Sequence, residues 1–382
     1  MNVRHSENGS AISTLGLAPS PAAERIVLNE QEFRRMISLE RKRSERSRKP
    51  FLLMLLDLGE NLCSEKSAKV LAEILDALSQ STRETDIVGW YEEHSTVGIM
   101  FTEIGVEARG ATLNTLVTRI SETLRGSLTF EQFDEVSLSF HIFPDDWDQS
   151  DGRRPGNRSL YPDLAERERA RKSSRAVKRA IDVAGSLAAL VILSPVFLLS
   201  AIAIKVTSKG SIFFRQQRVG QFGVPFSLLK FRSMYANSNS NAHKEYVRQL
   251  IAGVADKHPS NGGGRAVYKL TSDSRITAVG AFLRRTSIDE LPQFINVLKG
   301  DMSLVGPRPP IDYEVEKYDL WHRRRLMEAK PGITGLWQVT GRNRIAFDDM
   351  VRLDLKYAQL WSPWLDLKIL LRTPKAVAEG AH

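Results

Sequence analysis

Two acidic residues stand next to each other in the stretch TSIDELPQF, residues 286–294, within an otherwise apolar run. Ser287 and Glu290 have the S-x-x-E spacing of a helix capping box, in which both side chains only satisfy backbone N–H groups. Pro292 fits a first helical turn, so Asp289 and Glu290 are expected at a helix N-terminus, which favours carboxylates and attracts phosphate. A structural cap and a working pair of carboxylates are both open at this point.

Basic residues gather around this acidic pair. Arg284 precedes it, and Arg308 follows between two prolines. Because the prolines restrict its backbone, Arg308 loses little backbone entropy on binding an oxyanion, and its planar guanidinium suits phosphate. In the sequence LLKFRSM, a strand period of two places Lys230 and Arg232 on one face. Two neighbouring cations suit a phosphate, although a solvated basic strand edge explains the spacing equally well. Adjacent carboxylates among arginines favour phosphoryl transfer assisted by Mg²⁺, which prefers carboxylate and phosphate oxygens.

A stretch of 22 residues without a charge, residues 183–204, precedes these motifs. As a straight helix it would be roughly 33 Å long, enough to cross a bilayer, which argues against a buried core helix. Pro195 removes a backbone hydrogen bond at its middle, and Ser194 can bond the carbonyl so freed. Basic residues flank both ends, and positive charge stays cytoplasmic, which favours a re-entrant helix over residues 180–206. A kinked spanning helix is the alternative.

The region from residue 30 to residue 147 has the pattern of a separate α+β domain. Its alternation and apolar spacing predict a strand, a helix, a two-strand hairpin, a helix and a strand. The corresponding ranges are 51–58, 66–82, 87–101, 107–125 and 135–143. The order strand, helix, strand, strand, helix, strand predicts a ferredoxin-like layer.

This order, with LLDL before the first helix and RETDIVGWYEE leading into the hairpin, resembles diguanylate-cyclase-type domains. Those enzymes carry Gly-Gly-Asp/Glu-Glu-Phe in the hairpin, where this chain has GWYEEH. The missing second glycine removes the close backbone approach that a nucleotide phosphate needs. The domain is therefore predicted to be a degenerate cyclase-like domain with a regulatory or dimerising role, and a homodimer is left open.

Composition limits the number of domains, the class of binding partner and the kind of site that this chain can have. A chain of 382 residues predicts two or three domains, and a net charge of +9 indicates attraction to anions without choosing among nucleic acid, lipid headgroups and small phosphorylated molecules. The single cysteine, Cys63, excludes an internal disulfide and a cysteine-based zinc site. The histidines show no HExxH spacing. A nucleophilic Cys63 and nucleic-acid binding by the basic linker are the weaker readings.

The segments between the domains read as connections. Residues 1–29 are a polar tail without an apolar core of signal-peptide length, and they are expected to be disordered. Residues 148–177 form a basic linker with glycine and proline, helical in its second half. Residues 261–264 are candidates for a mobile loop over a site.

The C-terminal region predicts further helices near a membrane. Residues 314–330 are expected to form one charged helix with His322 exposed on it, stopped by a Pro-Gly pair. Beyond it, Trp361 and Trp364 lie near a proline and are followed by amphipathic spacing, which is typical of a bilayer interface but also of packing within a domain. Arg342 is a weaker candidate for a substrate contact.

From about residue 178 to 376 the sequence resembles the bacterial sugar transferases, monotopic polyprenol-phosphate phosphoglycosyl transferases of the type that initiates exopolysaccharide synthesis. The resemblance rests on KRAIDVAGSLAALVILSPVFLL, KFRSM, LRRTSIDELPQFINVLKGDMSLVGPRP and PGITGLWQVTGRN, in that order. It implies transfer of a sugar 1-phosphate from a UDP-sugar to polyprenol (undecaprenyl) phosphate with release of UMP. Residues 178–382 are expected to form a small α/β catalytic domain with a re-entrant membrane helix and interfacial amphipathic helices.

The resemblance also implies roles for individual residues. Asp289 matches the family's nucleophile, which forms a covalent phosphosugar intermediate, and it matches a Mg²⁺ contact; Glu290 matches its dyad partner. Cations that match active-site phosphate-binding residues are Lys230, Arg284 and Arg308. Ser194 and Pro195 match the break of the membrane helix.

The expected partners are therefore a UDP-sugar, polyprenol phosphate and the lipid bilayer, and no nucleic acid. The expected location is the bacterial inner (cytoplasmic) membrane, with the catalytic domain facing the cytoplasm. Glucose, galactose and an N-acetylated aminosugar all remain open as the transferred sugar. The alternative from another class is a membrane-tethered regulatory protein with an inactive transferase-like half.

Overall fold

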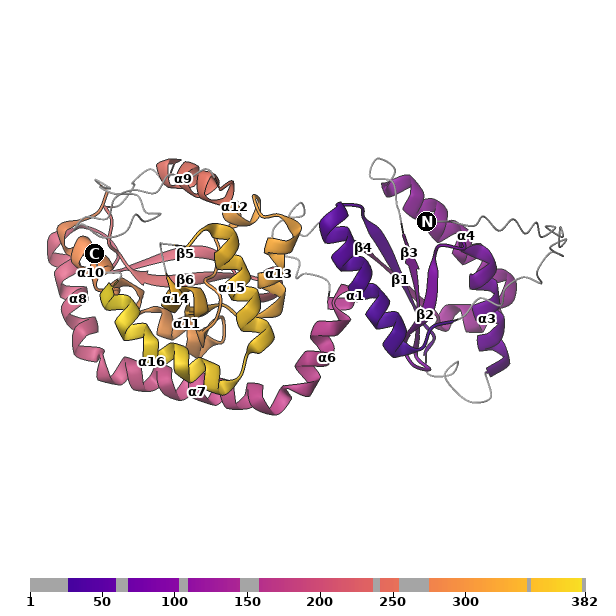
Figure 1. The fold of residues 1–382 in the computed structure, drawn as a ribbon, viewed down its shortest axis with the longest axis horizontal. Helices are drawn as coiled ribbons and strands as arrows, with labels where there is room; N and C mark the ends of the chain where they lie inside the picture. The colour runs from indigo at the N-terminus through magenta and orange to yellow at the C-terminus, as the bar shows by residue number, and fades with distance from the viewer. Residues whose placement is uncertain are drawn as a thin grey trace, which may run out of the picture.

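The computed structural model describes residues 27–59, 68–102, 109–144, 158–235, 241–253, 275–341 and 345–379. An N-terminal domain, residues 27–144, and a C-terminal half, residues 158–379, lie side by side, with the helices α6 and α7 running from one to the other (Figure 1). Some of the predicted features lie outside the described residues: Cys63, Arg342, residues 261–264, residues 148–157 of the linker and nearly all of the 1–29 tail.

The N-terminal domain contains the predicted four-stranded sheet. Its strands pair antiparallel in the order β2-β3-β1-β4. The predicted order strand, helix, strand, strand, helix, strand is confirmed by β1 (Phe51–Asp57), α3 (Ala68–Ser81), β2 (Ile87–Glu92), β3 (Thr96–Phe101), α4 (Arg109–Ser127) and β4 (Ser137–Phe143). Two further helices, α1 (Glu30–Ser47) and α5 (Phe130–Glu135), complete this domain.

Both faces of this sheet are covered, which explains the continuous apolar run of β1. Along the strand, Leu52, Met54 and Leu56 join one apolar cluster with α3 and α4. The residues between them, including Leu53, join a second cluster with Phe33 of α1. Because successive strand side chains point to opposite faces, a strand buried on both faces has no polar alternation.

The glycine of the sequence GWYEEH has a packing role in this structure. Gly89 on β2 pairs with Gly98 on β3, and a Cβ atom at either position would lie 2.8 Å or less from the side chain of Phe33. The two glycines thus leave room for the aromatic ring by which α1 packs on the sheet. This glycine pair is used for helix packing.

The connection between the halves is helical. After the 3-10 turn η3 (Arg158–Leu160), helix α6 (Pro162–Ala170) is followed by α7 (Lys172–Ile192) and α8 (Ser194–Thr207). The helical second half of the predicted linker is confirmed.

The C-terminal half combines short strands with many helices. An antiparallel hairpin is formed by β5 (Phe213–Val219) and β6 (Pro225–Phe231), joined by η4 (Gln221–Gly223); β7 (Ser303–Val305) pairs with β8 (Gly332–Thr334) in parallel. The helices around them are α9 (Asn241–Ile251), α10 (Ala278–Arg285), α11 (Gln293–Lys299), α12 (Asp312–Val315), α13 (Leu320–Glu328), α14 (Leu336–Thr340), α15 (Phe347–Leu360) and α16 (Pro363–Glu379). The mixed helix and sheet architecture is thereby confirmed.

The single charged helix predicted for residues 314–330 is wrong. The chain forms α12 and α13 with a break between them, and Asp319 is the N-cap of α13. His322 was expected to be exposed but is buried: its Nδ1 accepts from the Asp319 N–H at 3.0 Å, and its Nε2 lies 3.2 Å from Asp348. The sequence did not predict the burial of His322, because histidine is not a residue type that usually caps a helix.

Polar contacts anchor the first part of α7 inside the C-terminal half. Lys178 forms an ion pair with Asp366 of α16 at 2.6 Å, and Arg179 donates to two carbonyls at the end of α11. Asp182, which is buried, accepts from the Ser303 hydroxyl and the Leu304 N–H of β7. The base of the apolar segment is therefore fixed against β7, the strand that leads to Arg308.

Candidate active site

The acidic pair lies in a tight reversal between two helices. Helix α10 begins with a hydrogen bond from the Gly280 N–H to the Thr277 side chain and ends at Arg285. Ser287 then takes a left-handed conformation (φ 58°), and a single 3-10 turn, η5 (Ile288–Glu290), carries both acids to Pro292, the N-cap of α11. The predicted place just before a helix is confirmed.

The capping-box reading of this stretch is wrong. Ser287 forms no side-chain cap hydrogen bond, because its left-handed backbone reverses the chain instead of beginning a regular helix. The Glu290 carboxylate pairs with the Lys230 ammonium at 2.9 Å. Glu290 is thereby available to the site instead of serving as a cap.

Asp289 is a buried carboxylate with cations near it. Its residue is 7% exposed, and burial raises the pKa of its carboxyl to about 6. Lys230 and Arg284 oppose this rise, whereas the neighbouring Glu290 adds to it. A carboxyl with this pKa is mostly ionised at pH 7 but is less solvated than an ordinary aspartate, which increases its reactivity toward an electrophile.

The strand that carries Lys230 is held to the acidic turn by a buried amide. Asn296 of α11 accepts from the Leu229 N–H and donates to the Ser227 carbonyl, both on β6. Because α11 follows directly on η5, this link fixes the distance between Lys230 and the acidic pair. No sequence motif singles out Asn296, since an asparagine in a helix is ordinarily exposed.

Arg232 lies at a different place from Lys230. Its guanidinium donates to the carbonyl and the hydroxyl of Ser208, both at 2.7 Å, at the end of α8. A strand period of two would place the two cations on one face, but the strand ends at Phe231, before Arg232. Arg232 thus ties the apolar segment to β6, and phosphate binding by this residue stays a prediction.

Arg308 is presented by a segment packed backbone against backbone. The Gly306 N–H donates to the Thr334 carbonyl and the Gly332 N–H donates to the Pro307 carbonyl, both at 2.8 Å. A Cβ atom on Gly306 or Gly332 would lie 2.2 Å or less from the facing backbone. The sequences VGPRP and PGITG are therefore neighbours in space, and Arg308 projects exposed between two buried prolines.

Arg218 is a buried arginine that the sequence motifs did not single out. It lies on β5 with 4% exposure, and burial and the nearby Arg308 cation lower its pKa to about 10. The carboxylate of Glu290 acts on it in the opposite direction. The charges of both Arg308 and Glu290 therefore act on Arg218. The only signal for it in the sequence is a basic residue one position before the end of a strand.

The apolar segment is broken where it was expected to break. Helices α7 and α8 are bent by 60° at Ser194 and Pro195. Pro195 leaves the Val191 carbonyl without its usual helical donor, and the Ser194 hydroxyl donates to this carbonyl at 2.8 Å. Within the described residues, only this bent pair of helices, and no single helix, has the length and apolar composition of a membrane crossing.

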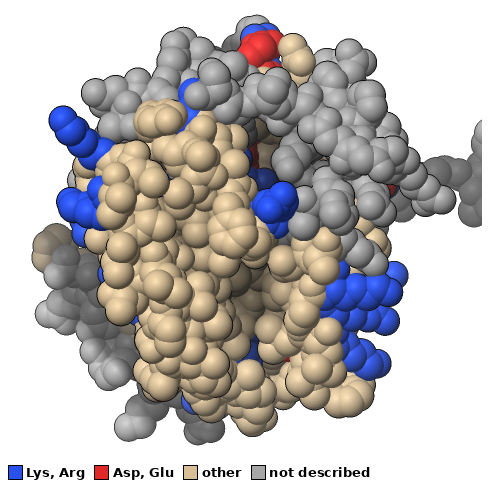
Figure 2. All heavy atoms as spheres, turned by 90° about the vertical axis from the view of Figure 1, so that its left-hand side faces the viewer, with Lys and Arg blue, Asp and Glu red and all other residues tan. Residues whose placement is uncertain are grey.

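The bent helices carry a wide uncharged surface. Figure 2 shows the face that includes α8 as a broad area without charged side chains, bordered by Lys and Arg. The exposed apolar residues of the two helices around the bend are Leu187, Val191, Ile192, Leu198, Leu199, Ile202 and Val206. A patch of this kind marks an interaction surface.

The geometry defines a site with a buried carboxylate, a Lys-Glu pair and several arginines beside a broken apolar helix. The family profile "Bacterial sugar transferase" matches residues 173–380. The chain belongs to this family.

Curated relatives agree with this assignment. An undecaprenyl-phosphate galactose phosphotransferase of Salmonella typhimurium is 45% identical over 56% of this chain and 43% of its own length. The exopolysaccharide production protein ExoY of Rhizobium meliloti is 40% identical over 52% of this chain and 84% of its own. A UDP-glucose:undecaprenyl-phosphate glucose-1-phosphate transferase of Caulobacter vibrioides is 38% identical over 51% and 67%. The chain spans less than half the length of the first relatives that it matches.

Among solved structures, a DGC protein from Thermotoga maritima is similar to 32% of this chain and 86% of its own, with 20% identity and a TM-score of 0.26.

Proposed function

We propose that this protein transfers a sugar 1-phosphate from a UDP-sugar to polyprenol phosphate, releases UMP, and so initiates a polysaccharide or glycoconjugate repeat unit. The named functions of relatives support the reaction class: one transfers galactose phosphate and another glucose phosphate to undecaprenyl phosphate.

The observation that carries this proposal is the environment of Asp289. A carboxylate that is buried, raised in pKa to about 6 and faced by Lys230 and Arg284 is suited to attack a phosphorus atom whose charge those cations spread. Its position in a turn braced by α10 and α11 leaves it little freedom to reorient.

The proposed reaction has two displacements at one phosphorus. An Asp289 carboxylate oxygen attacks the sugar-bearing phosphorus of the UDP-sugar, the bond to the bridging oxygen breaks, and UMP leaves with that bonding pair. A phosphate oxygen of polyprenol phosphate then attacks the same phosphorus and releases the carboxylate, giving polyprenol diphosphate sugar. Neither displacement requires a proton, so the cations Lys230, Arg284 and Arg308 need only bind and orient phosphate oxygens.

Mg²⁺ fits the carboxylates of this site. Among the described residues, no group of three or more His, Cys, Asp or Glu side chains has the arrangement of a metal site. Asp289 and Glu290 are nevertheless adjacent, and Mg²⁺ is ordinarily held by one or two carboxylates together with substrate phosphates. Bound there, the ion would neutralise part of the diphosphate charge.

The membrane is the second substrate's source in this proposal. The uncharged face of α7 and α8 suits the hydrocarbon region, and the exposed Trp364 on α16 suits a bilayer interface. Trp361 instead donates to Asp366 inside the domain. We place the protein at the bacterial cytoplasmic membrane with a re-entrant α7–α8 hairpin and the site on the cytoplasmic side. Reporter tags at both ends should be cytoplasmic, and a periplasmic tag at either end would overturn the re-entrant arrangement.

UMP release tests the proposed activity. Membranes containing the protein, incubated with Mg²⁺, polyprenol phosphate and UDP-glucose, UDP-galactose or a UDP-N-acetylhexosamine, should release UMP with at least one donor. Asp289→Asn should lower the rate by at least about 10³-fold because the amide cannot act as the nucleophile. Asp312→Asn, an exposed carboxylate on α12, is the matched control and should leave the rate unchanged.

The same assay separates the enzyme from a regulatory protein with an inactive transferase-like half. Normal binding of UDP-sugar without UMP release from any donor would favour the regulatory protein. Full activity of the Asp289→Asn protein would exclude Asp289 as the nucleophile.

A further inference from the structure

Three consecutive carbonyls of the segment that presents Arg308 are each held by a separate donor. The Arg325 guanidinium donates to the Arg308 carbonyl at 2.8 Å, and the Arg218 guanidinium donates to the Pro309 carbonyl at 2.8 Å. The Val219 N–H donates to the Pro310 carbonyl at 2.9 Å. The backbone of this segment is therefore fixed by β5 on one side and by α13 on the other, while the Arg308 side chain is exposed.

The two buried arginines have no freedom to bind substrate themselves. Arg325, with 2% exposure, pairs at 2.7 Å with Asp354, which has 1% exposure. Arg218 directs its Nε and its other terminal nitrogen to the Gln216 side chain. Both act on the site by holding the backbone around Arg308, which makes them positioning residues.

The residue before Arg325 faces the other half of the molecule. Arg324 pairs at 2.7 Å with Glu328 on its own helix and lies 3.9 Å from Glu45 of α1. Met327 of the same helix is buried in the apolar cluster that contains Phe33 of α1. Helix α13 thus contacts the N-terminal domain through Arg324 and Met327, and it contacts the Arg308 segment through Arg325.

The N-terminal domain is fixed to the connecting helices as well. Arg41 of α1 is fully buried, donates to both carboxylate oxygens of Asp163 on α6, and lies over the Tyr161 ring at 4.4 Å. Helices α1 and α6 would consequently move together, and their movement would displace α13.

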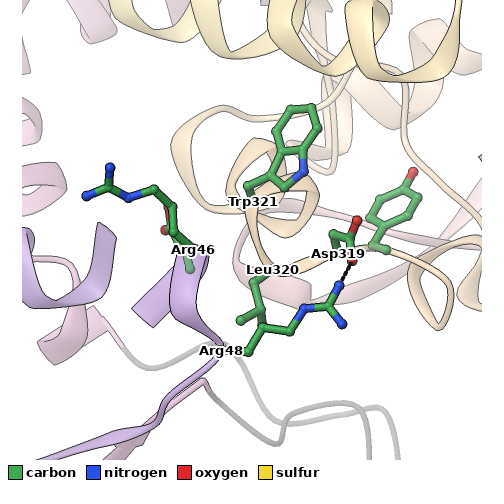
Figure 3. A pocket seen from close by; sticks show the side chains of 7 residues that line it. Arg46, Arg48, Asp319, Leu320 and Trp321 are labelled. Atoms are coloured by element: carbon green, nitrogen blue, oxygen red, sulfur yellow. Dashed lines mark hydrogen bonds and ion pairs between the residues drawn. The ribbon is translucent and has the colours of Figure 1, made fainter. Parts of the chain in front are cut away.

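The contact between α1 and α13 is incompletely packed at one end. A cavity of about 270 Å³ lies there, lined by Glu45, Arg46 and Arg48 from the end of α1 and by residues 318–321 at the start of α13. Figure 3 shows Arg48 reaching across to Asp319, an exposed pair at 3.0 Å. At this end of the contact, the ion pairs Arg324–Glu45 and Arg48–Asp319 link α1 to α13 in place of close packing.

We propose that α13 couples the N-terminal domain to the sugar-nucleotide site. Arg324 contacts Glu45 of α1, and Arg325 holds the backbone of Arg308, so a shift of α1 moves α13 and with it Arg308. The proposal rests on the proposed function for the role of Arg308 in binding the UDP-sugar. The coupling itself is a property of the fold and is measurable without turnover.

Amide hydrogen exchange of the full-length protein tests the coupling independently of activity. Arg324→Gln should speed exchange in peptides covering residues 305–313 several-fold, because the link to α1 is lost, and Glu45→Gln should do the same. The double variant should exchange no faster than Arg324→Gln alone, since Glu45→Gln removes only a contact that Arg324→Gln has already lost. Arg48→Gln, which removes the exposed pair at the same junction, is the matched control and should leave these peptides unchanged.

Kinetics of UMP release add a readout that a general loss of structure would not give. Arg325→Lys keeps a cation beside Asp354 but loses the planar fork, so the KM for UDP-sugar should rise about tenfold with little change in kcat. Arg324→Gln should raise the KM about fivefold. Arg325→Lys with an unchanged KM would overturn the positioning role.

Unchanged exchange in both Arg324→Gln and Glu45→Gln would overturn the coupling to the N-terminal domain. A wild-type protein that releases no UMP but shows the predicted exchange would contradict the proposed function and leave the coupling standing, so the two failures are distinguishable.

Discussion

The two halves of the molecule are stabilised in different ways. In the N-terminal domain, β1 alternates between two apolar clusters, and the buried polar residues of the described part are few: Arg34, Arg41, Ser44 and Asp86. In the C-terminal half, the buried residues include many ionisable ones: Asp182, Arg218, Arg232, Asp289, Glu314, His322, Arg325, Asp354 and Asp366.

A site made of short segments requires buried polar contacts to hold those segments in place. Long strands and helices bury enough apolar area to fix their own positions, whereas η5 and β7 have only three residues each and cannot bury as much. Buried polar side chains such as Asp182, Asn296 and Arg325 fix those segments by bonding their backbones or neighbours. Such contacts are costly to break singly, so the precision of the site depends on individual polar residues.

Removing one partner of a buried ion pair should give the largest loss of stability. Asp354→Ala leaves Arg325 buried without its carboxylate, which should cost about 3–5 kcal/mol in the free energy of unfolding. Asp349→Ala on the same helix removes an exposed pair with Arg352 and should cost less than about 0.5 kcal/mol. Chemical denaturation of both variants checks this, and equal losses would contradict the dependence of the C-terminal half on buried ion pairs.

Truncation in the apolar core of the N-terminal domain should have the next largest effect. Leu53 is fully buried against α1, so Leu53→Ala should cost about 2–4 kcal/mol through lost burial and a cavity. Phe130→Ala, at a residue that is 86% exposed, is the control and should be near neutral. Denaturation followed by amide hydrogen exchange in peptides of β1 reports on this domain; a near-neutral Leu53→Ala would show that the sheet does not depend on this cluster.

The pH dependence of UMP release should follow the buried aspartate. Burial raises the pKa of Asp289 to about 6, and only the carboxylate form can attack, so activity should be lost as the pH falls through about 6. Well below that value the rate should fall about tenfold per pH unit. Because Lys230 lowers this pKa, Lys230→Met should move the midpoint to a higher pH. A wild-type midpoint near 4 would contradict the desolvated environment.

The break in the apolar segment should give the smallest effect. Ser194→Ala removes the hydroxyl that donates to the Val191 carbonyl and should lower stability by about 1 kcal/mol. Adding Pro195→Ala restores a backbone N–H for that carbonyl and should recover most of the loss. Thermal unfolding in lipid nanodiscs measures both variants; a double variant less stable than Ser194→Ala alone would contradict the proposed role of the serine.

The elements fixed by apolar burial were easier to predict from the sequence than the segments fixed by polar contacts. The strand order of the N-terminal domain and the β5–β6 hairpin were predictable because periodic apolar residues specify them. The break at Pro195 was predictable because proline lacks an N–H, whatever surrounds it.

Tertiary polar contacts were not predictable in this way. The S-x-x-E spacing at Ser287 indicated a cap, but a left-handed Ser287 and the attraction of Lys230 for Glu290 overrode it. Arg232 shares the strand period with Lys230 and yet binds Ser208. His322 and Arg218 are buried by elements far away in the sequence, so no local pattern reveals their surroundings.

The most direct test of the account is to look for the phosphosugar on Asp289. Purified protein mixed with Mg²⁺ and a UDP-sugar that supports turnover, without polyprenol phosphate, should give a stoichiometric burst of UMP. Mass spectrometry of the quenched protein should then show a hexose phosphate on a peptide containing Asp289, and polyprenol phosphate should remove it. Release of UMP only after polyprenol phosphate is added, or a label on another residue, would contradict the account.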